Sequence, residues 1–299
     1  MKKLLLQLDS DPYPSSFDRI VALDAGVDEV LSYGGVTPAD ATALVHGAIF
    51  TRGPEDLHQT AVWVGGSSAT SGELLLQTVL QAFFGPFRVS VMMDSNGCNT
   101  TAAATVAAVA ASGELAGKRA VVLAGLGPVG LRVAELLALQ GARVAVTTPW
   151  PELMGERWDA ERAARDRAQA ETAAAKAGFT VQAVDGRPAL IGALEDTTVA
   201  VSAAPLAVNM LKEDDWASHP TLRVLVDLNP RPPLGLDGLK PTDVGKVRSG
   251  KTVFGALGLG GLKMKVHRRC VGKLFEARDQ VLDRTSIFEV ARPLLAEGG

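Results

Sequence analysis

The chain has 299 residues, of which 47% are hydrophobic and 21% are charged, a balance typical of soluble globular proteins and unlike that of a disordered chain. Its 30 basic and 33 acidic side chains leave a formal net charge of −3, which provides no electrostatic footprint for nucleic acid. Two cysteines, Cys98 and Cys270, are too few for a disulfide framework or a multi-cysteine metal site, and they suit a reducing, cytoplasmic setting.

The first residues share two lysines with the start of a signal peptide, but Gln7 and Asp9 interrupt the apolar run at once, so we expect a strand there. No stretch approaches the ~20 apolar residues of a membrane span, so we expect no membrane partner. Strand and helix patterns alternate in the first part of the chain. The expected strands are Leu4–Leu8, Glu29–Tyr33, Ala61–Gly65 and Phe87–Met93, and the expected helices are Phe17–Ala25, one that starts at Thr37, Ser71–Phe84 and Asn99–Ala111.

A second alternating series follows the break at Ser112 and Gly113. Its expected strands are Arg119–Ala124, Ala142–Thr148, Thr180–Val184, Thr198–Ser202, Arg223–Leu228 and Val253–Leu257, and its expected helices are Val129–Leu139, Trp158–Ala177, Leu262–Phe275 and Ser286–Leu295. Such alternation predicts parallel sheets covered by helices. We therefore expect an α/β protein with an N-terminal α/β substrate domain, residues 1–111 completed by 276–299, and a Rossmann-type, doubly wound domain, residues 112–275.

The strongest local motif is a G-x-G-x-x-G sequence between a predicted strand and a predicted helix. Gly125 is expected to permit a tight turn, Gly127 to let the backbone approach a pyrophosphate, and Gly130 to let helix and strand pack closely. Pro128 and Val129 open the helix, whose free N–H groups and positive dipole end suit phosphates. The loop therefore predicts a dinucleotide site.

The next strand indicates which dinucleotide is bound. NAD-binding units usually carry Asp or Glu at its end, whereas this chain has Thr147 and Thr148, which would not repel a 2′-phosphate. Arg157 and Arg162 follow and can supply charge, although each taken singly is typical of a solvated helix face. We therefore predict NADP, with NAD possible, and we add three residues at the ends of later strands to the cofactor site: Ser202, Asn229 and Ala256.

A dense polar set follows the strand that ends at Met93. One residue suffices to cap a helix, so the set predicts a site for a polar heterocycle at the carboxyl end of the sheet; its members are Asp94, Ser95, Asn96, Asn99, Thr100 and Thr101. A second constellation joins Gly260 and Gly261, which let backbone lie against a flat ligand, to Lys263 and Lys265 at an expected helix start.

At these residues the sequence resembles the bacterial NAD(P)-dependent methylene-tetrahydromethanopterin dehydrogenases of one-carbon metabolism. The matching segments cover nearly the whole chain: Thr51–Gly53, Phe83–Ser90, Asp94–Thr101, the glycine loop, Asn229 with Pro232–Gly235, and Phe254–Lys265 with His267, Arg268, Cys270 and Lys273–Phe275. The segment Pro149–Trp158 departs from the family, whose members have a shorter basic turn there, and this departure weakens the prediction of NADP.

The resemblance implies a homo-oligomeric enzyme with its pterin in an interdomain cleft, and in some members tetrahydrofolate is also accepted. It implies a catalytic-site Lys263 and a pterin-contacting Thr101, and we add Phe17 as an expected substrate contact. Hydride transfer leaves the net charge of the site unchanged, so positioning the two rings is expected to be the main contribution. Because a protonated Lys263 would oppose the new methenyl cation, Asp94 is expected to act as its counter-charge.

Two alternatives remain open from the sequence. A folate dehydrogenase–cyclohydrolase needs a Tyr with a Lys four residues later, but Phe17 and Thr37 stand at that spacing after Tyr13 and Tyr33, so a folate enzyme would lack cyclohydrolase activity. A non-catalytic NADP-sensing protein would be expected to lose the polar set or Lys263. We interpret all four histidines, His46, His58, His219 and His267, as structural or surface residues, because their spacing fits no metal site.

Overall fold

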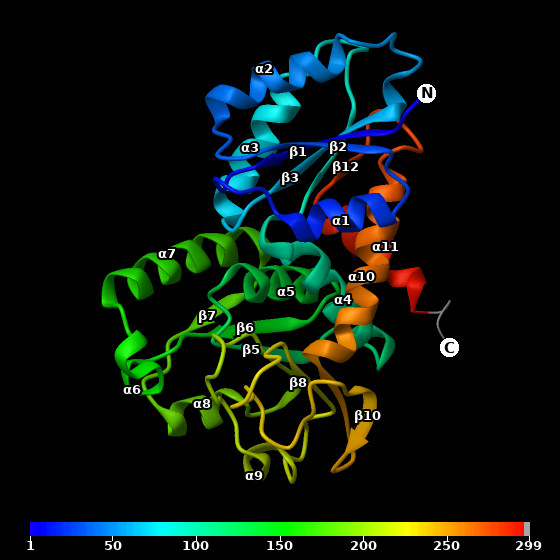
Figure 1. Cartoon of the computed structure of the whole chain (residues 1–299). Coiled ribbons are helices and arrows are strands. Elements are labelled where there is room, and N and C mark those ends of the chain that lie inside the picture. The colour runs from blue at the N-terminus through cyan, green and yellow to red at the C-terminus, as the bar shows by residue number, and fades with distance from the viewer. Residues whose placement is uncertain (296–299) are drawn as a thin grey trace. The chain divides into compact units, whose positions relative to one another are not determined.

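The computed structural model describes residues 1–295, which divide into two compact units (Figure 1). The first contains Met1–Thr100 and the described residues from Lys263 onward, and the second contains Thr101–Leu262. Both boundaries fall inside helices, namely α4 (Cys98–Ala111) and α10 (Ala256–Lys273). The sequence predicts these boundaries later in the chain, after residues 111 and 275. The end of the expected C-terminal segment, 296–299, lies outside the described residues.

The first unit is built on a five-stranded sheet in the order β12-β4-β3-β1-β2, with every pairing parallel. Its strands are β1 (Leu4–Asp9), β2 (Glu29–Tyr33), β3 (Thr60–Gly65), β4 (Ser90–Met93) and β12 (Val281–Leu282), and its helices include α1 (Ser16–Asp24), α2 (Pro38–Ile49), α3 (Ala69–Gln81) and α11 (Arg284–Leu294). Every residue of β3 and β4 is buried, as expected for parallel strands covered on both faces. The chain runs from β1 to β2 on one side and then to β3 on the other, so the sheet has a switch point between β1 and β3.

The second unit contains a seven-stranded sheet in the order β10-β11-β9-β8-β5-β6-β7. Its strands are β5 (Arg119–Leu123), β6 (Arg143–Thr147), β7 (Thr180–Gln182), β8 (Thr197–Ser202), β9 (Val224–Asp227), β10 (Val244–Arg248) and β11 (Lys251–Gly255), and its helices include α5 (Pro128–Leu139), α6 (Pro151–Met154), α7 (Ala160–Ala177), α8 (Arg187–Ala193) and α9 (Glu213–Trp216). Only the edge pair β10–β11 is antiparallel within this described sheet. The order reverses between β5 and β8, and part of the core, including Trp216 and Leu225, lies beside β8 and β9.

Two expected elements begin well away from their expected first residue. The strand expected from Phe87 begins at Ser90, because Phe84 and Phe87 exchange backbone hydrogen bonds in a turn. The helix expected from Leu262 begins at Ala256, so its glycines are helical and Lys263 lies in mid-helix. None of the helices between residues 1 and 295 is both long and apolar enough to cross a membrane.

Candidate functional site

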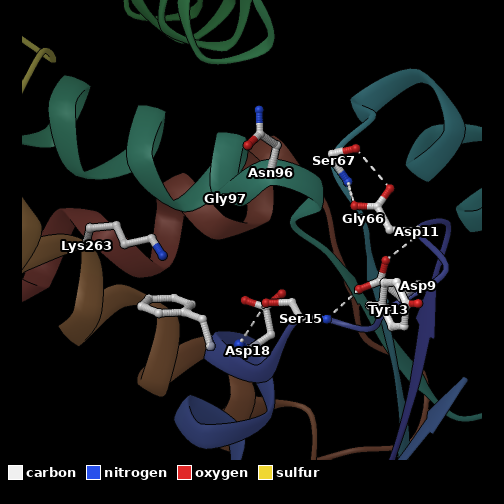
Figure 2. Close-up of a pocket in the computed structure, with 11 residues that line it drawn as sticks. Asp9, Asp11, Tyr13, Ser15, Asp18, Gly66, Ser67, Asn96, Gly97 and Lys263 are labelled. Carbon is white, nitrogen blue, oxygen red and sulfur yellow. Dashed lines mark hydrogen bonds between the residues drawn. The ribbon is translucent and has the colours of Figure 1, made fainter. Parts of the chain in front are cut away.

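A cavity of about 330 Å³ lies in the first unit, where β1 and β3 end (Figure 2). Ligands of open α/β sheets bind at such a switch point, outside the carboxyl ends of the strands. The β1 end and α1 supply Asp9, Asp11, Tyr13, Ser15, Phe17 and Asp18, the β3 end supplies Gly66 and Ser67, and Asn96, Gly97 and Lys263 complete the lining. We call this cavity the switch-point pocket.

Lys263 reaches the switch-point pocket from α10. Its Nζ lies 4.5 Å from the centre of the Phe17 ring and 3.4 Å from Nδ1 of His267, to which the ammonium group can donate. The His267 ring stacks on Trp63, with centroids 4.7 Å apart and planes inclined by 7°. Burial, helped by the charge of Lys263, lowers the pKa of His267 to about 3, so the imidazole is neutral and can accept that hydrogen bond. His267 therefore packs in the core against Trp63 and positions the Lys263 side chain in the pocket.

Two carboxyl groups near Lys263 have altered acidity. Burial raises the pKa of Asp18 to about 6, although the Ser15 hydroxyl and the charge of Lys263 lower it. Burial likewise raises the pKa of Asp94 to about 7, against the hydrogen bonds from Thr100 and the attraction of Lys263. Lys263 thus has two carboxyl groups within electrostatic range.

Most of the polar set after β4 is used by the turn itself. Oδ1 of Asp94 accepts the backbone N–H groups of Asn99 and Thr100, and its Oδ2 accepts the Thr100 hydroxyl at 2.6 Å. The Ser95 hydroxyl donates to the Gly65 carbonyl. The Asn99 amide donates to the Met93 carbonyl. Helix capping therefore accounts for Asp94 and Thr100, and bonds to the ends of β3 and β4 account for the Ser95 hydroxyl and the Asn99 amide. Contact of these four residues with a substrate stays a prediction.

Asn96 is the member of that set whose position differs. It has a left-handed backbone with φ of 56°, is exposed, and lines the switch-point pocket together with Gly97. Thr101 is half-buried at the start of the second unit, where its carbonyl accepts the Thr105 hydroxyl. Gly260 and Gly261 lie in α10, and a Cβ at either would meet no atom within 4 Å.

The glycine loop joins β5 to α5, at the switch point of the second sheet. A Cβ at Gly127 would meet no atom within 4 Å, so the space before the start of α5 is open to a phosphate group. A Cβ at Gly130 would lie 2.5 Å from the Gly125 carbonyl oxygen, so the first turn of α5 packs closely against the glycine loop itself. The positive φ of the turn, 48°, belongs to Ala124 rather than Gly125. Gly125 is required instead because a Cβ there would lie 2.5 Å from a methyl group of Val122.

The residues expected near the ribose are mostly bonded within the unit. The Thr147 hydroxyl accepts the Ala124 N–H, which fixes the glycine loop, and the Thr148 hydroxyl bonds to the backbone of Val184. The exposed Arg157 donates to the Leu206 carbonyl at 2.7 Å. The side chains of Thr147 and Thr148 are both buried and hydrogen-bonded within the protein. Discrimination of a 2′-phosphate by these two residues therefore stays a prediction without geometric support.

The remaining expected cofactor residues surround the ends of β8, β9 and β11. Ser202 is buried at the end of β8, directly across the switch point from the glycine loop. Asn229 bonds to the Pro233 carbonyl and the Arg231 N–H, and so shapes the proline loop after β9. Ala256 is the first residue of α10. Their positions at carboxyl strand ends are those that a dinucleotide contacts in this fold.

Comparison with known proteins gives concordant matches. Residues 16–96 match the family described as methylene-tetrahydromethanopterin dehydrogenase, N-terminal. The bifunctional protein MdtA of Methylorubrum extorquens is 43% identical over 98% of this chain and 99% of its own length. The NAD(P)-dependent methylenetetrahydromethanopterin dehydrogenase of the same organism is 33% identical over 97% of this chain and 98% of its own.

A solved structure supports the fold alone. Shikimate 5-dehydrogenase of Listeria monocytogenes, in complex with shikimate and NAD, aligns over 97% of this chain and 96% of its own length, with a TM-score of 0.51 and 12% identity. The two-domain α/β class predicted from the sequence is thereby confirmed.

Sequence reasoning missed the acidic side of the switch-point pocket. Asp9, Asp11 and Asp18 are separated by breaker residues and by the start of α1, so no single motif contains them. The strand order is what brings them to one site, because Asp9 ends β1, Gly66 follows β3 and those ends meet at a switch point, and the sequence alone does not give that order.

Proposed function

Because the chain belongs to the methylene-tetrahydromethanopterin dehydrogenase family, we propose that it transfers a hydride from a methylene-tetrahydropterin to NAD(P). The observation that carries the proposal is the switch-point pocket, which brings Phe17, Asn96 and Lys263 together in the first unit. The pterin head is placed there and the dinucleotide at the glycine loop of the second unit. The substrate domain is then the first unit, Met1–Thr100 with the described residues from Lys263 onward, and the Rossmann domain is the second, Thr101–Leu262. The boundaries expected after residues 111 and 275 would place Lys263 in the Rossmann domain, away from the rest of the pocket lining.

The chain's part in the reaction is to bind and orient. Phe17 offers a ring face, 49% exposed overall, to a flat heterocycle, and Lys263 and Asn96 offer hydrogen-bond donors to its oxygens. Catalysis of this kind depends on holding the reacting carbons about 3–3.5 Å apart. Thr101 is assigned to the same substrate.

The open space at Gly127 and the free N–H groups at the start of α5 fit a pyrophosphate. When bound, the nicotinamide accepts the hydride, so no side chain has to take up a proton. The substrate becomes a methenyl cation as the hydride leaves, and the carboxylates around Lys263 balance that charge. We assign NADP as the preferred cofactor, with NAD accepted.

Steady-state hydride transfer measured with methylene-tetrahydromethanopterin and methylene-tetrahydrofolate, each with NADP and NAD, tests the proposal. We expect turnover with methylene-tetrahydromethanopterin. Turnover with methylene-tetrahydrofolate alone would identify a folate enzyme instead. Absence of turnover with every pair, while dinucleotide still binds, would establish the sensing alternative instead. We further propose that the protein is cytoplasmic and that it forms a homo-oligomer. Light scattering on the purified protein tests the oligomeric state.

A further inference from the structure

Three carboxylates line the switch-point pocket, and two of them are already occupied. The oxygens of Asp9 accept the backbone N–H groups of Asp11 and Ser15. Those of Asp11 accept the N–H and the hydroxyl of Ser67. Both oxygens of each carboxylate are therefore bonded to the chain itself, and these two residues shape the loop between β1 and α1.

Asp18 differs because the backbone N–H that would ordinarily donate to it donates to Asp9 instead. It stands three residues after Ser15, the N-cap of α1, where an acidic side chain ordinarily bonds back to the N-cap N–H. Here that N–H, from Ser15, bonds to Asp9 at 3.0 Å. Within the described part of the chain the Asp18 carboxylate forms no salt bridge, and the Ser15 hydroxyl is its one hydrogen-bonding influence. Most of its acceptor capacity is left for a ligand.

The surroundings of Asp18 suit a flat ring with a polar edge. Phe17 precedes it in the same pocket, and Lys263 lies over that ring from α10. Figure 2 shows Asp18 on α1 and Lys263 on the opposite side of the pocket, with their polar ends toward the same space. A ring between them would meet an anionic acceptor at one edge and a cationic donor at another.

We propose that Asp18 is the specificity-determining residue that binds the 2-amino-4-oxopyrimidine edge of the substrate. That edge carries two adjacent donors, N3–H and the 2-amino group, in the geometry that a carboxylate accepts in a bidentate manner. The Lys263 ammonium then faces the 4-oxo oxygen. This inference rests on the proposed function for the identity of the substrate, and it adds recognition of the pyrimidine edge to the electrostatic role of the Asp18 carboxylate.

The test exchanges one group on the protein and one on the ligand. Lumazine differs from pterin in having an oxo group in place of the 2-amino group, so it offers a donor and an acceptor at the same edge. Asp18→Asn matches that pair, because an amide accepts from N3–H and donates to the oxo group. Equilibrium binding of pterin and of lumazine is measured by fluorescence titration of wild type and variant, in the full-length protein.

We expect wild type to prefer pterin and Asp18→Asn to shift the pterin-to-lumazine affinity ratio toward lumazine by about 10²-fold, since a charged hydrogen bond lost and an unpaired polar group each cost about tenfold or more. Asp24→Asn is the matched control. Asp24 ends the same helix, is exposed, and pairs with Arg268 at 3.5 Å outside the pocket, so the ratio should not change.

An unchanged ratio in Asp18→Asn, or a wild type without preference for pterin, overturns the inference. Should Asp18→Asn not fold, Asp18→Ala takes its place, and it should lose the preference for pterin without gaining lumazine. The proposed function is tested separately by hydride transfer. Turnover with an unchanged ratio refutes only the role of Asp18, whereas a shifted ratio without turnover refutes only the dehydrogenase.

Discussion

Lys263 and Lys265 are two residues apart on one helix, yet they line different cavities. Lys263 lines the switch-point pocket, whereas Lys265 is exposed beside Ala25 and Arg268. Lys263→Met should lower the rate of hydride transfer by roughly 10²-fold or more, because a misplaced reacting ring loses that much. Dinucleotide affinity should stay nearly unchanged, because the glycine loop lies in the other unit.

Lys265→Met is the matched control for this change, and it should keep nearly full activity. Steady-state kinetics and equilibrium binding of NADP to both variants measure the two effects. Equal, small losses would refute the role of Lys263, and a loss confined to Lys265→Met would transfer that role to the other lysine.

His267 makes a prediction about pH and stability. Its pKa falls to about 3 in the folded protein, mainly through burial, while the unfolded chain titrates near 6.5. Between these values the unfolded state binds more protons, so the stability due to neutral His267 is full above the higher value and is lost as the pH falls toward the lower. His267→Phe keeps a ring against Trp63 but cannot titrate.

The free energy of unfolding of wild type relative to His267→Phe should therefore fall by ~1.4 kcal/mol per pH unit between about pH 6 and about pH 4. Urea titrations of both proteins at several pH values measure it. Asp18 and Asp94, whose pKa values are raised, act in the opposite sense in both proteins, and their effects cancel in the difference to first order. A difference independent of pH would show that His267 titrates normally.

The candidate site was only partly predictable at the level of residues. Lys263, Asn96 and Phe17, each expected to contact the substrate, line one cavity, whereas Thr101 does not line it. Polarity predicts a ligand site at Asp94, Ser95, Asn99 and Thr100. Composition cannot show, however, that these side chains form hydrogen bonds within the protein. The sequence does not single out Asp18, because its carboxylate is free for a ligand only since Asp9, at the end of β1, accepts the Ser15 N–H in its place.

At the scale of elements, Gly127 just before α5 and Gly130 in its first turn are required for different physical reasons. A side chain at Gly127 would enter open space, whereas one at Gly130 would strike the backbone of Gly125. Gly127→Val should therefore leave the fold intact and abolish dinucleotide binding, because the branched side chain occupies the place of a phosphate.

Gly130→Ala should instead destabilise the protein by about 1–3 kcal/mol, the usual cost of overpacking. Thermal unfolding and cofactor titration of the two variants separate the effects. A Gly127→Val variant that is fully folded and binds NADP normally would disprove the assignment of this loop.

Regular elements were the most predictable feature of the fold. β2 has the expected bounds, and the strand and helix that flank the glycine loop each differ by one residue. β12, with two residues, and the edge strand β10 were missed, because neither has the buried apolar run of a central strand. The start of α10 was misplaced because glycine is a poor helix former, and tertiary contacts such as the hydrogen bond from the Gly258 N–H to the Pro241 carbonyl override the propensity.

At the scale of the whole molecule, the two ligands are assigned to different units. The switch-point pocket draws all its lining from the first unit, and the glycine loop belongs to the second. We expect NADP to slow amide hydrogen exchange around residues 125–130 and a reduced pterin to slow it around residues 9–18 and 66–67. Each ligand at about 100 times its Kd should stabilise the state it binds by about 2.7 kcal/mol.

Hydrogen-exchange mass spectrometry with each ligand alone gives the measurement. The matched comparison is Lys263→Met, in which protection by the pterin should weaken while protection by NADP persists. Protection of residues 125–130 by the pterin alone, with none around residues 9–18, would contradict the assignment of ligands to units.

The charge of the switch-point pocket should affect the kinetics of turnover. Three carboxylates and one ammonium group line the pocket, to which we assign a substrate ring that is neutral before hydride loss and cationic after it. We therefore expect the pocket to bind the oxidised ring more strongly than the reduced one, so that departure of the product limits the forward rate. Salt weakens this retention, because charges are screened over about 8 Å at physiological ionic strength. Forward turnover at saturating substrate thus rises with ionic strength, and inhibition by accumulated methenyl product declines with it.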